Sequence, residues 1–429
     1  MKIFKGKSRN IENNNSGVGE IVTKELSGIK LHGEEAVRRL SKKFDNWNPE
    51  SFRVSEEEIQ KAIKTLPETF KDDTRYCQSQ VRQFAEAQLE TLRGFEKEMQ
   101  PGVILGQKLI PISSVGAYVP GGRFPIVASV QMSMIPPKVA GVERVIACTP
   151  SQKGEGIHPG VLYAMDQAGV DEIYSLGGIQ AIGTMAYGIE GIKPVDFIVG
   201  PGNAFVAEAK RQVFGQVGID QIAGPSENLI IADEHADAEL VAADIWGQCE
   251  HDFNAVTILI TTSESFAKSV QEEMKKQIGS LGTREVAEAS WEKNGEIILV
   301  EDKFEAVKVA DDYAIEHVQV QAEDLDFYLE NLRNYGSLFL GEETTVTYGD
   351  KGIGTNHILP TEKAARYTGG LWIGKFLKTV TYQRCTREAS EKLAPIIARQ
   401  CRYEGMEAHA VTAELREKKF QREKTPSHT

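Results

Sequence analysis

Residues 172–187 read EIYSLGGIQAIGTMAY, and residues 197–213 read FIVGPGNAFVAEAKRQV. Each stretch opens with a short apolar run, turns at glycine and continues as an amphipathic segment of helical length. A strand followed by a helix has this pattern, and repeated strand–helix units predict a parallel sheet. The glycine turns of such units gather at the carboxyl edge of the sheet.

The same alternation runs through most of the chain. Before residue 101 the pattern is mainly helical, and Ser55 followed by three glutamates is a helix-start signal. From about residue 386 a charged helical stretch continues almost to the end. The predicted strands are 142–148, 172–176, 197–199, 229–232, 256–260, 297–300 and 337–340. We therefore expect an α/β protein with parallel-rich sheets.

The predicted organisation has four parts. A polar arm covers residues 1–20, and one α/β domain combines residues 21–117 with 226–375. A second α/β domain occupies residues 118–225, and a helical tail covers 376–429. The tail has no apolar core of its own, so we expect it to pack against another surface.

The net charge and the cysteine pattern limit the kinds of molecule that the protein is expected to bind. Lys and Arg number 49 and Asp and Glu number 62, a formal net charge of −13. An acidic chain is a poor candidate for binding nucleic acid or an anionic membrane. The five cysteines are scattered without a C-x-x-C pair, which favours reduced thiols in the cytoplasm. A small anionic substrate in a locally basic site is not excluded.

Three glycine-rich turns are candidates for contact with a cofactor. They occupy residues 118–122, 176–180 and 200–203, each at the end of an apolar run. Glycine lets a cofactor approach the backbone at the carboxyl edge of a parallel sheet. None matches G-x-G-x-x-G, so the ordinary dinucleotide fingerprint is absent. Each turn, taken alone, also fits a simple strand-to-helix connection.

Four of the eight histidines have chemically suggestive neighbours. Gln248 and His251 are three residues apart and could direct two ligands at one metal, although a surface or capping role also fits. Glu316 and His317 are adjacent, and such a pair can divide acid–base work between two pKa ranges; a polar loop is the alternative.

The other two histidines lie near the end of the chain. Asp350 and His357 share a glycine-rich segment, where an aspartate is a plausible zinc ligand and a structural turn is the alternative. His409 lies on the helical tail, where a lone histidine is more often a solvated or packed residue than a ligand.

The order and spacing of these segments carry a resemblance to a known family. The chain is similar to the histidinol dehydrogenases from about residue 94 to about residue 416. The segments that carry it are SVGAYVPGG, LGGIQAI, VGPGNAFVAEAKRQV, AGPSENLIIAD, GQCEH, IEHV, GTNHILPT and EGMEAH. The resemblance implies a homodimer with shared active sites and two incomplete Rossmann-like domains per chain. It also implies that the terminal arm and tail embrace the partner.

The resemblance further implies the site. One zinc ion per subunit would have as ligands Gln248, His251, Asp350 and, from the other subunit, His409. Glu316 and His317 would be the acid–base pair. The implied substrate contacts are Ser226, Gln248, His251, His317, Asp350, His357, Glu404 and His409. The positions on the side of the NAD cofactor would be Tyr118, Gln180 and Asn203.

The implied reaction is a four-electron oxidation of a primary alcohol to a carboxylate through a retained aldehyde. In this scheme His317 takes the hydroxyl proton while hydride passes to NAD. Glu316 then helps water add to the aldehyde, and a second NAD accepts a second hydride. Zinc mainly positions the substrate.

The substrate is the point where the sequence departs from ordinary histidinol dehydrogenases. Residues 369–376 read GGLWIGKF, which is more similar to the branch that includes sulfopropanediol 3-dehydrogenase. We expect a small polar diol such as 2,3-dihydroxypropane-1-sulfonate, with Lys363 or Arg402 near its anionic end. Glu404 favours the alternative, L-histidinol, because a carboxylate beside a sulfonate is unfavourable. A second alternative is an inactive paralogue that binds a metabolite.

Overall fold

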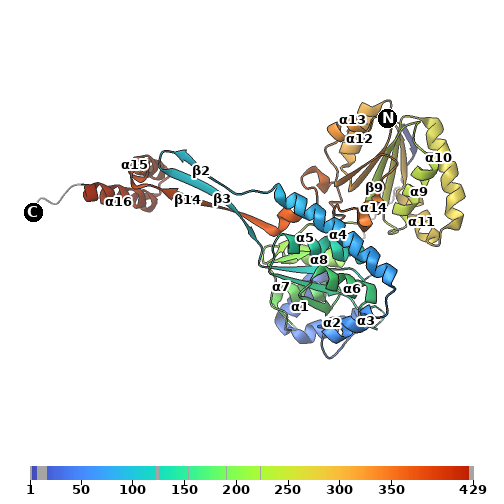
Figure 1. Cartoon of the computed structure of the whole chain (residues 1–429), viewed down its shortest axis with the longest axis horizontal. Coiled ribbons are helices and arrows are strands. Elements are labelled where there is room, and N and C mark those ends of the chain that lie inside the picture. Colours follow the sequence, from blue (N-terminus) through green and yellow to red (C-terminus); the bar gives the residue numbers. More distant parts are fainter. Residues whose placement is uncertain are drawn as a thin grey trace, which may run out of the picture. The chain divides into compact units, whose positions relative to one another are not determined.

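In the computed structural model, the chain folds into two compact units (Figure 1). The first unit comprises Met1–Leu89 and Ile112–Phe376, and the second comprises Glu90–Pro111 and Leu377–Thr429. The structure describes residues 2–6, 17–121, 125–152, 154–189, 191–222 and 224–424. Most of the predicted arm, Gly122 of the first glycine turn and the last five residues of the predicted tail lie outside these ranges.

A five-stranded parallel sheet forms one part of the first unit, in the order β6-β5-β4-β7-β8. The chain moves outward from the central β4 and then returns to its other side, so the order reverses between β4 and β7. Ligands of open parallel sheets bind at such a switch point. The strands are β4 (Ser114–Tyr118), β5 (Arg144–Thr149), β6 (Glu172–Ser175), β7 (Phe197–Val199) and β8 (Gly218–Ile219).

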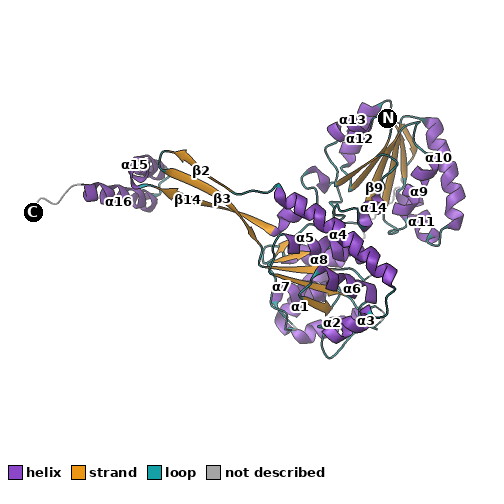
Figure 2. Cartoon of the chain, in the orientation of Figure 1, coloured by secondary structure: helices purple, strands orange, loops and turns teal. Residues whose placement is uncertain are grey.

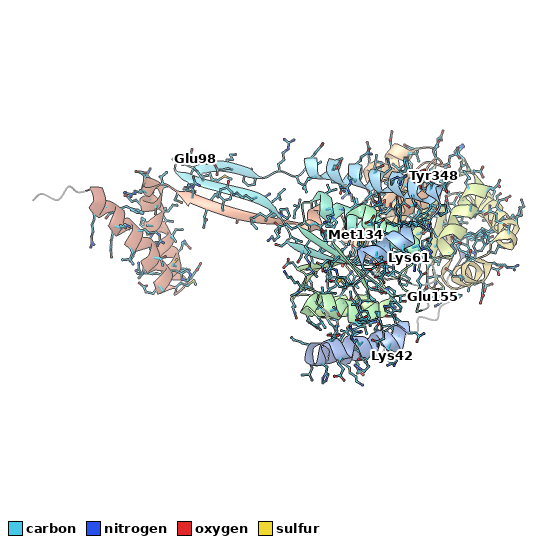
Figure 3. All side chains as sticks on the ribbon, turned by 60° about the horizontal axis from the view of Figure 1, so that its bottom comes forward. Lys42, Lys61, Glu98, Met134, Glu155 and Tyr348 are labelled. Carbon is cyan, nitrogen blue, oxygen red and sulfur yellow. The ribbon has the colours of Figure 1, made fainter. Side chains whose placement is uncertain are left out.

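Helices alternate with these strands, as the sequence predicts. They are α5 (Val127–Val139), α6 (Pro159–Ala168), α7 (Gly178–Tyr187) and α8 (Ala204–Val213). Met134 of α5 is fully buried, whereas the side chains of Lys42 and Lys61 are exposed (Figure 3). β4 is a buried strand that the apolar-run analysis did not single out.

The N-terminal helices pack on this five-stranded sheet. They are α1 (Val18–His32), α2 (Glu34–Asp45) and α3 (Glu56–Ile63), followed by α4 (Glu68–Glu90). Leu26 and Ile29 of α1 share a core with Ile182 of α7. Ser55 forms a capping box with Glu58 at the start of α3, which confirms the predicted helix start. This packing differs from the predicted grouping of residues 21–117 with the later α/β domain.

The six-stranded sheet is the second sheet of the first unit, in the order β1-β11-β10-β9-β12-β13. All neighbours pair in parallel except β1 (Lys2–Lys5), which runs antiparallel to β11 and lies within the predicted arm. The remaining strands are β9 (Glu227–Ala232), β10 (Val256–Thr261), β11 (Glu296–Leu299), β12 (His317–Gln321) and β13 (Ser337–Leu340).

Helices cover both faces of this sheet (Figure 2). One face packs on α9 (Ala238–Cys249), α10 (Glu264–Gln277) and α11 (Arg284–Asn294). The other face packs on α12 (Lys303–Tyr313) and α13 (Leu325–Asn331). Alternate residues of a strand face opposite sides, so His317, Gln319 and Gln321 of β12 lie on the face that α9 covers. The short elements that follow are α14 (Val346–Lys351), η2 (Ala364–Arg366) and η3 (Ile373–Phe376).

The second unit combines a three-stranded antiparallel sheet with two helices. Its strands are β2 (Phe95–Gln100), β3 (Val103–Pro111) and β14 (Leu377–Cys385), in the order β14-β3-β2. The helices are α15 (Arg387–Tyr403) and α16 (Glu407–Lys424), which confirms the helical part of the predicted tail. The strands do not appear in the sequence prediction. None of the helices in the described residues has the length and apolar content needed to cross a membrane.

Candidate active site

The main chain of Glu227, at the start of β9, holds the predicted acid–base pair at the start of β12. The Glu227 N–H donates to Glu316 Oε2 at 3.0 Å. His317 Nδ1 lies 3.2 Å from the Glu227 carbonyl oxygen. Since a carbonyl can only accept, Nδ1 of the neutral ring carries the proton and Nε2 is the basic nitrogen. Nε2 is buried and has no hydrogen-bond partner, so it is available to a ligand.

Burial raises the pKa of Glu316 and lowers the pKa of His317, so it favours the neutral form of each group. Glu316 is 6% exposed and its pKa lies well above the usual value, first because of burial and then because of the nearby Glu227 and Asp350 charges. Burial lowers the pKa of His317 to about 4, although Asp350 opposes this shift. The pair therefore consists of a neutral imidazole beside a carboxyl group that is a stronger base than an exposed one.

Three of the predicted histidines surround Asp350. His251 Nε2 lies 3.7 Å from Asp350 Oδ2, and His317 Nε2 lies 3.7 Å from Oδ1. His357 Nδ1 donates to the Asp350 carbonyl oxygen at 2.8 Å, and burial lowers its pKa. The two 3.7 Å separations exceed hydrogen-bond length. The sequence analysis placed Asp350 in a glycine-rich segment; in the structure it belongs to the short helix α14.

Gln248 lies on the last turn of α9, and α9 ends at Cys249. His251 therefore follows the helix in a turn, with its N–H 3.3 Å from the Gln248 carbonyl oxygen, and the two residues do not share a regular helix face. Gln248 is 4% exposed, and its side-chain oxygen has no partner. A buried polar atom without a partner calls for a water, an ion or a ligand. Ser226, another predicted contact, directly precedes β9.

The donor set in the first unit fits part of a metal site. It consists of a buried amide oxygen from Gln248, an imidazole from His251 and a carboxylate from Asp350, a mixed nitrogen and oxygen set of the kind that catalytic zinc sites use. Across the described parts of the chain, no three His, Cys, Asp or Glu residues come together as a metal site. The predicted fourth ligand, His409, is exposed on α16 in the second unit, as is Glu404 after α15. The first unit thus contains three of the four predicted metal ligands.

A half-buried carboxylate next to the site was missed by the sequence analysis. Asp244 precedes Gln248 by one helical turn, and its Oδ2 accepts hydrogen bonds from Gln319 at 2.9 Å and from Gln321 at 2.8 Å. Its Oδ1 accepts from Thr345 at 2.8 Å, just before α14. Asp244 therefore joins the three elements that carry Gln248, His317 and Asp350. The available signal was the polar side chains at alternate positions of an otherwise apolar strand.

The predicted NAD-side residues lie at the carboxyl edge of the five-stranded sheet. The Tyr118 hydroxyl accepts from the Gly178 N–H at 3.1 Å, and burial raises the pKa of Tyr118 to about 12. The Asn203 side chain caps α8. A Cβ at Gly200, which has φ of 119°, would lie 2.0 Å from the Tyr118 carbonyl oxygen. Only glycine fits at this switch point.

The two candidate anion-binding residues have different surroundings. Lys363 Nζ donates to the main-chain oxygen of Asp312 at 3.1 Å, and its side chain is exposed. Arg402, in the second unit, is held by the carboxylates of Glu407 and Glu414. The guanidinium of Arg402 is thus engaged by two carboxylates, and Lys363 is the better candidate.

Comparison with known proteins identifies the family of the chain. The family model "Histidinol dehydrogenase" matches residues 8–417. A "Histidinol dehydrogenase homolog" of Shouchella clausii is 53% identical over 97% of this chain and 99% of its own. The "Sulfopropanediol 3-dehydrogenase" of Ruegeria pomeroyi is 46% identical over 94% and 93%. A "Histidinol dehydrogenase" of Methanosarcina mazei is 43% identical over 92% and 90%.

A solved structure gives the same result for the fold. The crystal structure of histidinol dehydrogenase from Elizabethkingia anophelis has a TM-score of 0.91 and 32% identity, covering 97% of this chain and 95% of that chain. The protein is thus an oxidoreductase acting on a CH–OH group. It belongs to the histidinol dehydrogenase family.

Replacing Asp244 should destabilise the fold behind the site. Asp244→Ala leaves two buried amide donors and the Thr345 hydroxyl without their acceptor, at about 1–3 kcal/mol for each unsatisfied group. Asp244→Asn keeps one oxygen for the two glutamines, so it should lower the free energy of unfolding by less than Asp244→Ala does. Denaturant unfolding measures both variants.

Asp233→Ala is the matched control, because the Asp233 carboxylate accepts from the exposed backbone groups of His235 and Glu323 beyond the other end of β9. Asp233→Ala should lower the free energy of unfolding by less than Asp244→Ala does. An Asp244→Ala protein as stable as the wild type would contradict the assigned role of Asp244.

Proposed function

We propose that the protein oxidises a small polar primary alcohol to a carboxylate in two successive hydride transfers to NAD, with the aldehyde retained. The observation that carries this proposal is the buried neutral imidazole of His317, whose Nε2 has no partner, next to the Glu316 carboxyl group. The balanced reaction consumes one alcohol, two NAD⁺ and one water, and yields one carboxylate, two NADH and three protons.

His317 acts as the base for hydride transfer. Its Nε2 takes the alcohol proton, while the hydrogen bond from Nδ1 to the Glu227 carbonyl holds the ring in the required tautomer. The imidazolium so formed lies next to the Asp350 carboxylate, whose charge favours it. Asp350 thus offsets part of the cost of placing a positive charge in a buried site.

Glu316 acts in the hydration of the aldehyde. Its carboxylate accepts a proton from water as the water adds to the carbonyl carbon, and the hydrate then loses a second hydride. The raised pKa of Glu316 makes it a stronger base for this step than an exposed glutamate. Retention of the aldehyde prevents release of a reactive intermediate.

A zinc ion would be held by Gln248, His251 and Asp350 together with His409 of the partner subunit. When bound, zinc would supply a positive charge that orients the substrate oxygen. The unpaired side-chain oxygen of Gln248 and the spacing of His251 and Asp350 support this assignment. The exposure of His409 on α16 supports a homodimer in which each tail completes the other subunit's site.

NAD would bind at the carboxyl edge of the five-stranded sheet, near Tyr118, Gln180 and Asn203. The chain order reverses there between β4 and β7, and Gly200 leaves the backbone open to close approach. These features support a nucleotide site that lacks the usual glycine fingerprint.

The proposed substrate is an anionic diol such as 2,3-dihydroxypropane-1-sulfonate. Support comes from the GGLWIGKF segment and from the sulfopropanediol 3-dehydrogenase relative. L-histidinol is the alternative, since relatives named histidinol dehydrogenase have similar identity and Glu404 suits a cationic substrate. The presence of Glu316, His317 and the metal-binding candidates disfavours an inactive paralogue.

The two substrates are distinguished by NADH formation with the zinc-loaded protein. We expect a higher kcat/KM on (R)-2,3-dihydroxypropane-1-sulfonate than on L-histidinol. Lys363→Ala should raise KM for the sulfonate and leave KM for histidinol unchanged, because only the sulfonate has an anion for Lys363 to bind. Turnover of histidinol alone would make the substrate assignment wrong.

Two histidine variants separate metal binding from proton transfer. His251→Ala should lose zinc, as measured by elemental analysis of the purified protein. His317→Ala should keep zinc and lose about 10²–10⁴-fold in kcat, the range for removal of a general base. A His317→Ala enzyme with near-normal turnover would contradict the proposed mechanism.

A further inference from the structure

A carboxylate outside the predicted site holds one of its cofactor-side residues. Asp45, the last residue of α2, accepts a hydrogen bond from Gln180 Nε2 at its Oδ2, at 2.8 Å. It also accepts from the backbone N–H of Gly177. A Cβ at Gly177 would lie 3.1 and 3.2 Å from the two carboxylate oxygens. The 176–180 turn therefore packs directly on Asp45.

Local stability does not explain an acid at this position. A negative charge at the C-terminus of α2 opposes the helix dipole. Partial burial raises the pKa of Asp45 to about 6, despite the two hydrogen bonds that favour the carboxylate. The charged form is therefore less stable here than in water, and residues that break local rules concentrate at functional sites.

Asp45 fixes the orientation of the Gln180 side chain. Gln180 is 1% exposed, and its amino group is directed at the carboxylate of Asp45. The amide oxygen, on the other branch of the planar group, is thereby kept as an acceptor. Without a carboxylate partner, the amide of Gln180 could turn over and present its donor instead.

We propose that Asp45 is a positioning residue for the dinucleotide: it orients Gln180 so that the amide oxygen accepts a hydrogen bond from a hydroxyl or carboxamide N–H of NAD. This inference rests on the proposed function. Asp45 acts through Gln180 and through the glycine turn, and contacts neither the substrate nor the reacting atoms.

The test measures NAD⁺ affinity by calorimetry on the full-length, zinc-loaded protein. Asp45→Asn should weaken NAD⁺ binding about tenfold, the effect of one hydrogen bond lost or inverted. It should raise KM for NAD⁺ more than it lowers kcat at saturation, without loss of thermal stability. Asp166→Asn is the control, since Asp166 of α6 accepts from its neighbour Gln167.

A rescue variant separates positioning from general damage. In Asp45→Asn/Gln180→Glu the carboxylate and the amide exchange places, so the hydrogen bond and the net charge are kept and an acceptor oxygen still faces NAD. This double variant should recover most of the affinity lost in Asp45→Asn. A purely structural role for Asp45 predicts no such recovery.

The affinity should also depend on pH. Protonation of Asp45 below about pH 6 weakens the acceptor for Gln180, so wild-type affinity for NAD⁺ should fall there and that of Asp45→Asn should stay flat. Tyr118 of β4 and Cys148 of β5 stay neutral in this range, because burial raises the pKa of both.

Two failures are distinguishable. If the wild type binds NAD⁺ and Asp45→Asn binds it as tightly as Asp166→Asn does, the role of Asp45 is wrong and the proposed function stands. If the wild type does not bind NAD⁺, the proposed function itself is overturned.

Discussion

The hydrogen bonds of one residue's main chain organise the acid–base site. The Glu227 N–H holds the Glu316 carboxyl group, and the Glu227 carbonyl holds His317 Nδ1. The N–H and the carbonyl of Glu227 lie at the start of β9, which pairs with β12 in the six-stranded sheet. A pair fixed by backbone geometry has little freedom to rotate, so its position depends on the register of two strands. Burial of the same strand ends then shifts both pKa values toward the neutral forms.

The rest of the first unit supports this arrangement. Asp244 ties α9 to β12 and to the start of α14, so the helix that carries Gln248 and the segment that carries Asp350 are held to the strand that carries His317. A similar arrangement occurs at the carboxyl edge of the five-stranded sheet, where Asp45 accepts hydrogen bonds from the Gln180 side chain and from the Gly177 N–H. In each case a half-buried carboxylate accepts hydrogen bonds from residues at or beside a proposed ligand contact.

The sequence predicted the parallel strands well, because short apolar runs between glycine turns have few other structures available. It also predicted that His251, His317, His357 and Asp350 belong together, but only through family resemblance, since their spacing along the chain spans about a hundred residues. It missed β2, β3 and β14, which lack a clean alternation of apolar residues; β2 and β14 are largely exposed, and β3 is mostly half-buried. It also missed Asp244 and Asp45, because a single acid on a helix gives no local sign of the partner it meets through tertiary packing.

The central claim is that one site performs both oxidations without releasing the aldehyde. The most direct test counts NADH formed per molecule of alcohol consumed, in the presence of a hydrazine or semicarbazide trap for free aldehyde. The account predicts two NADH per carboxylate and no trapped aldehyde. One NADH per alcohol, with the aldehyde recovered in the trap, would contradict it.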